Sequence, residues 1–318
     1  MPPSTTELVT IPLDKELAQS RIAVAPDGRQ VYVTVRENNP DGPDPGAVCV
    51  IDTASHTVTA EIAVGRNPGG VAVTPDGRHV YVACWGAQAT GLASVIDTAR
   101  RAVVAEITLS GPHGIATDVA ISPDGSHAYV LTNQEQVDAS GRLNVIDTAS
   151  QTVIDKINIL VQDPRTIVVT PDGQRAYVNS ESEGVDVVVD LAAKSVGLTV
   201  EAFRMAITPD GRRAYAIRFA NQDVSVFDLA TEQLTHTILT QGLTTDVAIM
   251  QDGRHVYVTQ RHTTHNVIVI NTETNKVTGP PVTWNGLANA IAIAPNGTRA
   301  YVVDGHSRTI VVIPIPHF

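Results

Sequence analysis

VAVTPDGRHVYV, at Val71–Val82, is one of seven copies of a twelve-residue unit that decide the fold of this chain. The other six copies begin at Ile22, Val119, Ile167, Met205, Val247 and Ile291. Successive copies therefore start 38 to 49 residues apart. Short β-rich units that repeat at about this interval are typical of a β-propeller, in which each unit supplies one blade.

Each copy predicts two strands joined by a tight turn. Alternating Val, Ile and Ala precede Pro-Asp-Gly, and a run containing Tyr-Val follows it. Proline fixes φ, aspartate bonds nearby amides and glycine accepts positive φ, so Pro-Asp-Gly predicts a turn. A third run, such as Val48–Ser55 (VCVIDTAS), and a fourth, such as Val58–Val64, complete a four-stranded antiparallel blade with strands A, B, C and D.

The two ends of the chain predict how the ring of blades closes. Leu8–Leu13 (LVTIPL) has the pattern of a D strand, and Thr309–Ile315 (TIVVIPI) has that of a C strand. We expect Leu8–Leu13 to pair beside Thr309–Ile315 and complete the seventh blade, because closure removes the open sheet edges. Residues 1–318 would then form a single all-β domain, a seven-bladed propeller.

The repeated PDG…YV and VIDTA elements resemble those of the YVTN family of β-propellers, and the resemblance covers nearly the whole chain. It implies the seven-bladed fold and little about activity, because such relatives have diverse roles. Many relatives are exported, whereas MPPSTTELVTIPLDKE at the start of this chain lacks the pattern of a signal peptide.

Charge and composition restrict the partners and the compartment. With a net charge of −11, the chain lacks the positive field that attracts phosphate backbones, so we expect no nucleic-acid partner. No apolar run is long enough to span a bilayer, so we expect no membrane partner. Cys49 and Cys84 have no metal-binding spacing, and we expect two free thiols. These features predict a cytoplasmic monomer, although an exported mature form would look the same.

The loops of such blades lie on two faces that differ in how much they repeat. The A–B and C–D turns would form a turn face, where Pro-Asp-Gly and Ile-Asp-Thr recur. The B–C and D–A loops would form a variable face, where lengths range from Thr34–Ala47 to Asp304–Arg308. Function concentrates on variable loops held by a rigid frame. We therefore expect the site on the variable face, at the mouth of the central channel.

Alignment of the repeats predicts which side chains surround this mouth. Positions just after Tyr-Val and just before strand A hold a different residue in nearly every blade, so symmetric packing does not require them. The candidate ligand-binding residues at these positions are Arg21, Arg36, Trp85, Asp118, Asn133, Arg204, Arg218, Phe219, Asp246 and Arg261. Their guanidinium groups would bind a carboxylate or phosphate, and the aromatic rings would stack on the ligand.

Two interpretations of the arginines beside the inner strands stay open. They could hold a ligand, or they could form internal ion pairs that rigidify the channel. The arginines concerned are Arg21, Arg204, Arg218 and Arg261, and the acids within reach of such pairing are Asp118, Glu181, Asp246 and Asp304. On the turn face, most arginines follow the Asp of their own turn, so a solvated local pair explains them.

Acid–base and metal roles fall on the variable face as well. The candidate catalytic residues are Glu181, His113, His262 and His306. The weak candidates for a metal site are His262, His265, His306 and Asp304, and a plain surface role for the histidines is the alternative. We expect no cofactor. The sequence has no GxSxG, Walker A or CxxCH motif, which argues against a serine hydrolase, a nucleotide switch and a covalent haem protein.

Three functions are consistent with these features. The first is a propeller that binds a small polar, anionic molecule, as an enzyme of the lyase, cyclase or lactonase-like hydrolase type that needs only an acid, a base and a charge clamp. The second is a non-catalytic platform for another protein, which predicts an exposed apolar patch. The third is a structural or envelope component.

Overall fold

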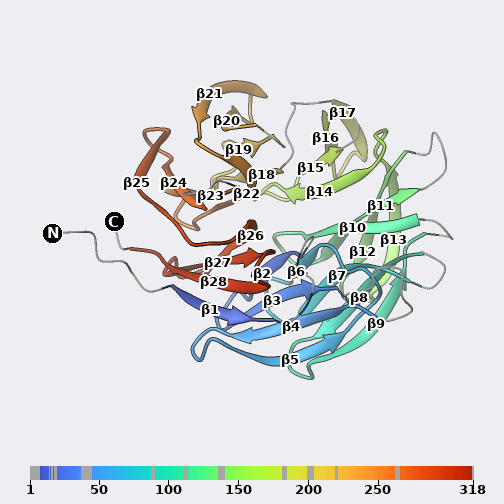
Figure 1. Cartoon of the computed structure of the whole chain (residues 1–318). Helices are drawn as coiled ribbons and strands as arrows, with labels where there is room; N and C mark the ends of the chain where they lie inside the picture. Colours follow the sequence, from blue (N-terminus) through green and yellow to red (C-terminus); the bar gives the residue numbers. More distant parts are fainter. Residues whose placement is uncertain are drawn as a thin grey trace.

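The computed structural model describes residues 8–13, 15, 17, 20–36, 45–86, 90–110, 114–134, 140–180, 185–198, 204–218, 221–261 and 266–316. Within these ranges the chain forms 28 strands and no helix. The strands make seven four-stranded antiparallel sheets around a centre (Figure 1), which confirms the predicted all-β propeller with seven blades.

The first four blades follow one another along the chain. Blade 1 consists of β2 (Ile22–Val24), β3 (Gln30–Val35), β4 (Ala47–Asp52) and β5 (Thr57–Ala63). Blade 2 consists of β6 (Val71–Val73), β7 (His79–Trp85), β8 (Gly91–Asp97) and β9 (Ala102–Thr108). Blade 3 consists of β10 (Gly114–Ile121), β11 (His127–Gln134), β12 (Arg142–Asp147) and β13 (Thr152–Asn158). Blade 4 consists of β14 (Pro164–Val169), β15 (Arg175–Ser180), β16 (Val185–Asp190) and β17 (Ser195–Leu198).

The last three blades continue the pattern until the final one, which takes a strand from the other end of the chain. Blade 5 consists of β18 (Arg204–Ile207), β19 (Arg213–Ile217), β20 (Asp223–Asp228) and β21 (Gln233–Leu239). Blade 6 consists of β22 (Leu243–Ile249), β23 (His255–Arg261), β24 (Val267–Asn271) and β25 (Lys276–Val282). Blade 7 consists of β26 (Ala288–Ile293), β27 (Arg299–Asp304), β28 (Thr309–Pro314) and β1 (Val9–Pro12).

The A strands form the innermost ring of the molecule. Each A strand contacts the A strand of the next blade, and β26 contacts β2, so the ring is closed. Figure 1 shows these strands around the centre, with β5, β9, β17, β21 and β25 at the rim. The residues just before and within the A strands are therefore brought together from all seven blades.

The repeated Pro-Asp-Gly segments form the predicted turns. The glycine of every A–B turn has a positive φ, between 67° and 74°. The carboxylate of the preceding Asp accepts a hydrogen bond from the amide two residues later, at 2.9 Å in the Asp27–Arg29 case. Glycine reaches this backbone region without strain, so the turn geometry follows directly from the repeated residues.

The tyrosines of the seven repeats anchor the core. Each is at most 6% exposed, and each lies among the Val and Ile side chains that alternate along the strands of neighbouring blades. Cys49 and Cys84 are buried in the same core and are free thiols, as expected. Burial raises the pKa of each thiol to about 12, so neither has the thiolate character that a reactive cysteine needs.

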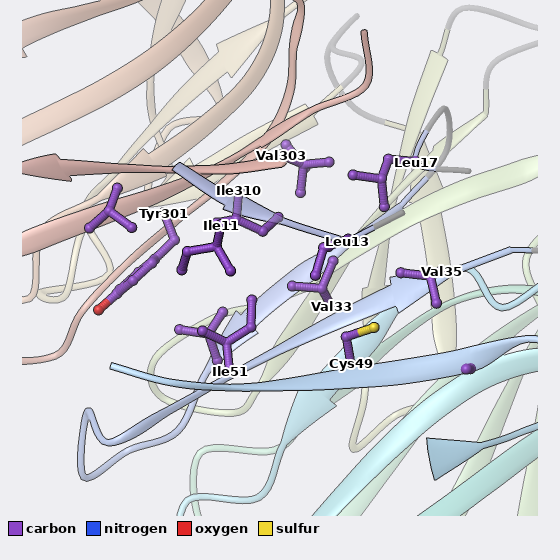
Figure 2. Close-up of a cluster of buried hydrophobic side chains, with 14 of the residues drawn as sticks. Ile11, Leu13, Leu17, Val33, Val35, Cys49, Ile51, Tyr301, Val303 and Ile310 are labelled. Atoms are coloured by element: carbon purple, nitrogen blue, oxygen red, sulfur yellow. The ribbon is translucent and has the colours of Figure 1, made fainter. Parts of the chain in front are cut away.

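The N-terminal strand closes the ring as predicted. Strand β1 pairs antiparallel with β28, with Val9 opposite Val312 and Pro12 opposite Thr309. Figure 2 shows Ile11, Leu13 and Leu17 packed among side chains of blades 1 and 7. Ile11 is 2% exposed and Leu17 is fully buried. The segment therefore both completes blade 7 and fills the junction between the first and last blades.

Three turn-face arginines bind the next blade. The local-pair interpretation is wrong for Arg175 and Arg213, and it did not cover Arg299, whose turn has Asn296 in place of an aspartate. Arg175 Nη2 donates to Leu229 O at 3.1 Å, Arg213 Nη1 to Thr272 O at 2.6 Å, and Arg299 Nη1 to Thr53 O at 2.8 Å. Arg78 does pair with its own Asp76, at 3.8 Å. The side chain that follows the turn by two residues can thus link blades.

Among the described residues, no helix is long and apolar enough to cross a membrane.

Candidate functional site

The residues just before strand A, or early within it, form one ring of seven around the centre of the propeller. The residues of this ring are Arg21, Gly70, Asp118, Thr166, Arg204, Asp246 and Ala290. In blades 3, 4, 6 and 7 the A–B pairing has a β-bulge beside this position, for example between Thr244 and Asp246. Bulges re-aim side chains, and they are frequent next to functional sites.

Two identical Thr-Asp segments connect neighbouring inner strands. Thr117 Oγ1 donates to Pro164 O at 2.8 Å, and Asp118 Oδ2 accepts from Ile167 N at 3.1 Å. Thr245 and Asp246 make the same two contacts one half-turn further round the ring, with Ala288 O at 2.8 Å and Ile291 N at 3.0 Å. Each segment therefore fastens its own blade to the next one at the mouth of the channel.

Asp246 also has an arginine partner in the preceding blade. Arg204 Nη1 lies 3.0 Å from Asp246 Oδ1, and the two side chains are 12% and 15% exposed. Asp246 Oδ1 additionally accepts a hydrogen bond from Val247 N at 3.0 Å. Arg204 and Asp246 therefore form an internal ion pair, which is one of the two interpretations that the sequence left open for these arginines. The pair occupies at least part of the Arg204 guanidinium.

Asp118 has a different neighbour at the equivalent place. The preceding blade carries Gly70 there, and a Cβ on Gly70 would lie 1.9 Å from Asp118 Oδ1. Gly70 is therefore needed for the close approach of the Asp118 carboxylate. Burial raises the pKa of Asp118, while the Arg21 charge and the amides of Ile167 and Val119 lower it.

Among the charged groups that change the pKa of Asp118, Arg21 has the largest effect. Burial lowers its pKa to about 10, and the Arg204 charge adds to this effect. Asp118 and Asp246 raise the pKa and offset only part of the fall. Among the described residues, no carboxylate oxygen lies within 4.0 Å of the Arg21 guanidinium, and none of its N–H groups has a hydrogen-bond acceptor.

Charged side chains of both signs act on Arg21. The charges of Arg204 and Arg36 lower its pKa, and those of Asp118 and Asp246 raise it.

Two other predicted ligand-binding residues lie on the variable face in contacts of their own. Trp85 ends β7, and its backbone exchanges two 2.7 Å hydrogen bonds with Arg66. Asn133 Nδ2 donates to Asp163 Oδ1 at 2.7 Å, and Arg165 Nη2 lies 3.1 Å from Asp163 Oδ2. Asn133 is thus part of a small polar cluster in blades 3 and 4.

Arg218 and Arg261 also have partners outside the central cluster. Arg218 Nη2 lies 3.4 Å from Asp223 Oδ2 across the end of the B–C pair in blade 5. Arg261 is exposed, and its Nη2 donates to Asn289 Oδ1 at 3.3 Å. Neither contact tests the predicted binding role, which stays a prediction.

Asp304 behaves as a capping acid. Its side chain is fully buried and accepts hydrogen bonds from Trp284 Nε1 at 2.8 Å, Leu287 N at 2.9 Å and His306 N at 2.9 Å. Burial would raise its pKa, but hydrogen bonds from Leu287, Ser307 and Trp284 outweigh this and lower the pKa. His306 is exposed in the same turn.

Several predicted residues lie outside the described ranges. They are His113, Glu181, Phe219, His262 and His265. In the described part of the chain, His, Cys, Asp and Glu side chains form no group of three that could hold a metal ion. The acid–base, aromatic and metal predictions for these five positions stay predictions.

Sequence reasoning missed two features. The pentapeptide TDVAI occurs at both Thr117–Ile121 and Thr245–Ile249, and this repetition is the signal for the two Thr-Asp segments. Asp186, which is 1% exposed, accepts a hydrogen bond from Asn179 Nδ2 at 2.9 Å inside blade 4, and burial raises its pKa to about 8. The aligned position in the other blades is apolar, so the aspartate was visible as an exception.

No family model and no curated protein matches the chain, so the resemblance to the YVTN family stays a prediction. Among solved structures, the chain is similar to the hydrazine synthase of Kuenenia stuttgartiensis, with a TM-score of 0.75 and 20% sequence identity. The alignment covers 95% of this chain and 97% of that chain. At this level of identity the similarity concerns the fold alone, a seven-bladed propeller of the same overall arrangement.

Proposed function

We propose that this protein binds a small anionic molecule at the mouth of its central channel, on the variable face. The observation that carries the proposal is Arg21, a partly buried guanidinium without an ion pair among the described residues. A desolvated positive charge is unfavourable unless an anion compensates it, and guanidinium groups bind carboxylates and phosphates through paired N–H donors.

The surrounding charges support the same proposal. Arg36 and Arg204 lie within electrostatic reach of Arg21, so the positive charges of three arginines act in the same region. Both aspartates are also engaged by backbone amides of the next blade. The acids therefore hold the frame, and the arginines supply the attraction for a ligand.

Thermal shift measurements test this function directly. Sodium phosphate, sulfate, acetate and glycolate would be compared at constant ionic strength, because a ligand that binds only the folded state stabilises it by an amount that grows with the ratio of its concentration to its dissociation constant. At least one of these anions should raise the Tm of the native protein and leave that of Arg21→Gln unchanged. Arg29→Gln, an exposed arginine on the opposite face of the same blade, is the matched control. Equal shifts in both variants would contradict the proposal.

Catalysis would extend this binding function. An elimination, ring opening or ring closure of the bound anion needs a general acid and a base beside a charge clamp. His306 is exposed on the variable face and is the acid–base candidate within the described residues. The same proposal includes kinship with YVTN repeat proteins, on the PDG…YV and VIDTA elements.

A protein-binding platform is the second candidate function. Four exposed leucines lie on or beside D–A connections of the variable face: Leu160, Leu239, Leu243 and Leu287, with exposed fractions between 39% and 79%. Exposed apolar side chains on one face favour contact with another protein. Under this alternative, Arg21→Gln would leave the response to every small anion as weak as in the native protein.

A further inference from the structure

The chain contains two Asn-Gly pairs, and the fold restrains them differently. Asn285-Gly286 lies in the connection between β25 and β26 on the variable face, and Asn296-Gly297 lies in the A–B turn of blade 7. Both asparagines are exposed to solvent. A glycine that follows an asparagine leaves its backbone nitrogen open to the asparagine side chain, because no Cβ shields it. The two pairs therefore have the same local chemistry in different structural settings.

We propose that Asn285 is a site of covalent modification, where the folded protein loses the side-chain amide to water, whereas the turn of blade 7 protects Asn296. The modification converts a neutral side chain on the variable face into a carboxylate. It goes beyond the anion-binding function above and does not depend on it.

The reaction needs water as its sole co-reactant. Hydroxide or water accepts the proton of Gly286 N as this nitrogen attacks Asn285 Cγ. The N–Cγ bond forms, the Cγ–Nδ2 bond breaks, and Nδ2 takes a proton from water and leaves as ammonia. Water then adds to one carbonyl of the five-membered imide and cleaves the bond from that carbonyl to Gly286 N. Cleavage at Cγ gives aspartate, cleavage at the backbone carbonyl gives isoaspartate, and no atom is oxidised or reduced.

The structure leaves the side chain of Asn285 able to turn towards Gly286 N. Within the described ranges, no donor or acceptor binds the Asn285 amide. Gly286 N donates to Trp284 O at 3.2 Å, which is at the long end of the range for such bonds and closes a three-residue turn. Little therefore opposes the rotation that brings the attacking nitrogen to Asn285 Cγ.

The turn of blade 7 holds both reacting groups of the other pair. Gly297 N donates to Ala294 O at 2.8 Å, and Asn296 Oδ1 accepts bonds from Thr298 N at 3.1 Å and Thr298 Oγ1 at 2.8 Å. Asp124 makes the same two contacts with Ser126 in blade 3, at 3.0 and 2.8 Å, so they belong to the repeated turn. The nitrogen and the amide of the Asn296 pair have to leave these partners before they can react.

The two products should affect the neighbourhood of Asp304 differently. Trp284 Nε1 and Leu287 N, on either side of the Asn285 pair, donate to the Asp304 carboxylate at 2.8 and 2.9 Å. A Cβ on Gly286 would collide with this carboxylate, so the segment is closely packed there. Isoaspartate lengthens the backbone by one methylene and should disturb these contacts, whereas aspartate keeps the backbone length.

Peptide mapping by mass spectrometry follows both sites in one sample. The protein would be incubated at pH 8, once folded and once unfolded in urea. In the folded protein Asn285 should convert about tenfold or more faster than Asn296, because several hydrogen bonds hold the second pair. In urea the two rates should become similar. Thr298→Ala removes one bond to Asn296 Oδ1, so it should speed the conversion of Asn296 and leave that of Asn285 unchanged.

Variants of the two asparagines assign the modified species. Asn285→Gln should abolish the acidic form that accumulates in the folded protein, and Asn296→Gln, the matched control, should not. Equal rates at the two sites of the folded protein, or faster conversion of Asn296, would overturn the proposal. An Asn285 that converts in urea and stays intact in the folded protein would overturn it as well, and so would the absence of conversion in both states.

Discussion

Arg204 of blade 5 and Asp246 of blade 6 join two neighbouring inner strands by a 3.0 Å ion pair. The corresponding positions in blades 2 and 3 hold Gly70 and Asp118, so Asp118 has a glycine where Asp246 has an arginine. The two aspartates therefore differ in their neighbours: Arg204 pairs directly with Asp246, whereas Arg21 acts on Asp118 electrostatically from blade 1.

Arg204→Gln and Arg21→Gln should have opposite effects on stability. Removal of Arg204 leaves the Asp246 carboxylate without its ion pair, which should cost about 1–3 kcal/mol of unfolding free energy. Removal of Arg21 eliminates a positive charge that burial disfavours, so stability should stay equal or rise. Urea unfolding at pH 7 measures both, and a loss of similar size in Arg21→Gln would show that Arg21 is structural.

Removal of residues 1–14 should strongly destabilise the protein. The deletion takes away strand β1, exposes the edge of β28 and uncovers the core that Ile11 and Leu13 fill (Figure 2). Ile11→Ala alone should cost about 2–5 kcal/mol, because a buried isoleucine leaves a cavity. The exposed Thr10→Ala is the matched neighbour and should change little. An unchanged Tm after the deletion would contradict ring closure by β1.

Gly70→Ala should destabilise the mouth of the channel. The added Cβ would lie 1.9 Å from Asp118 Oδ1 and 2.7 Å from Asp118 Cα, so the backbone of blade 3 has to move. We expect a loss of about 1–3 kcal/mol, typical of overpacking. Gly197→Ala, whose Cβ would meet only Val188 Cγ1 at 3.3 Å, is the control. Equal Tm values for the two variants would contradict the close approach.

Asp186 should make stability fall as the pH rises. Its pKa is about 8 in the folded protein, above the ordinary value near 4, so the folded state holds a proton that the unfolded chain has released. Between about pH 4 and pH 8 this group therefore lowers stability by up to about 1.4 kcal/mol per pH unit. Asp186→Asn keeps the acceptor for Asn179 Nδ2 and should flatten this dependence. Parallel Tm profiles from pH 5 to pH 8 for the variant and the native protein would contradict this role of Asp186.

The fold could be predicted from the sequence because the same residues recur in every blade. Pro-Asp-Gly or a close variant, Gln251-Asp-Gly in blade 6 and Pro295-Asn-Gly in blade 7, encodes each A–B turn. The unmatched strand patterns at the two ends encode the pairing of Val9–Pro12 with Thr309–Pro314. The turns depend on local backbone chemistry, and the ring closure depends on the number of strands at each end. Neither requires knowledge of which side chains meet across the channel.

The contacts of the candidate site could be predicted only in part. Alignment brought Arg204 and Asp246 to one ring, but their pairing depends on the distance between blades 5 and 6. The role of Gly70 could not be inferred, because it depends on the missing side chain: a Cβ at this position would occupy the space of the Asp118 carboxylate. Arg213 was misjudged for a related reason: its chain is long enough to pass Asp210 and reach Thr272 O in the next blade.

The pairing of β1 with β28 has a consequence for the newly synthesised chain. Blades 1 to 6 each consist of consecutive strands and can form as the polypeptide emerges. Strand β1 is made first, yet its partner follows about 300 residues later, a delay of roughly 15–60 s at ordinary translation rates. Its apolar Val9 and Ile11 must stay out of wrong pairings throughout that interval. The seventh blade therefore marks the moment at which the ring of blades closes, and defects there would produce aggregation during synthesis even where the folded propeller is stable.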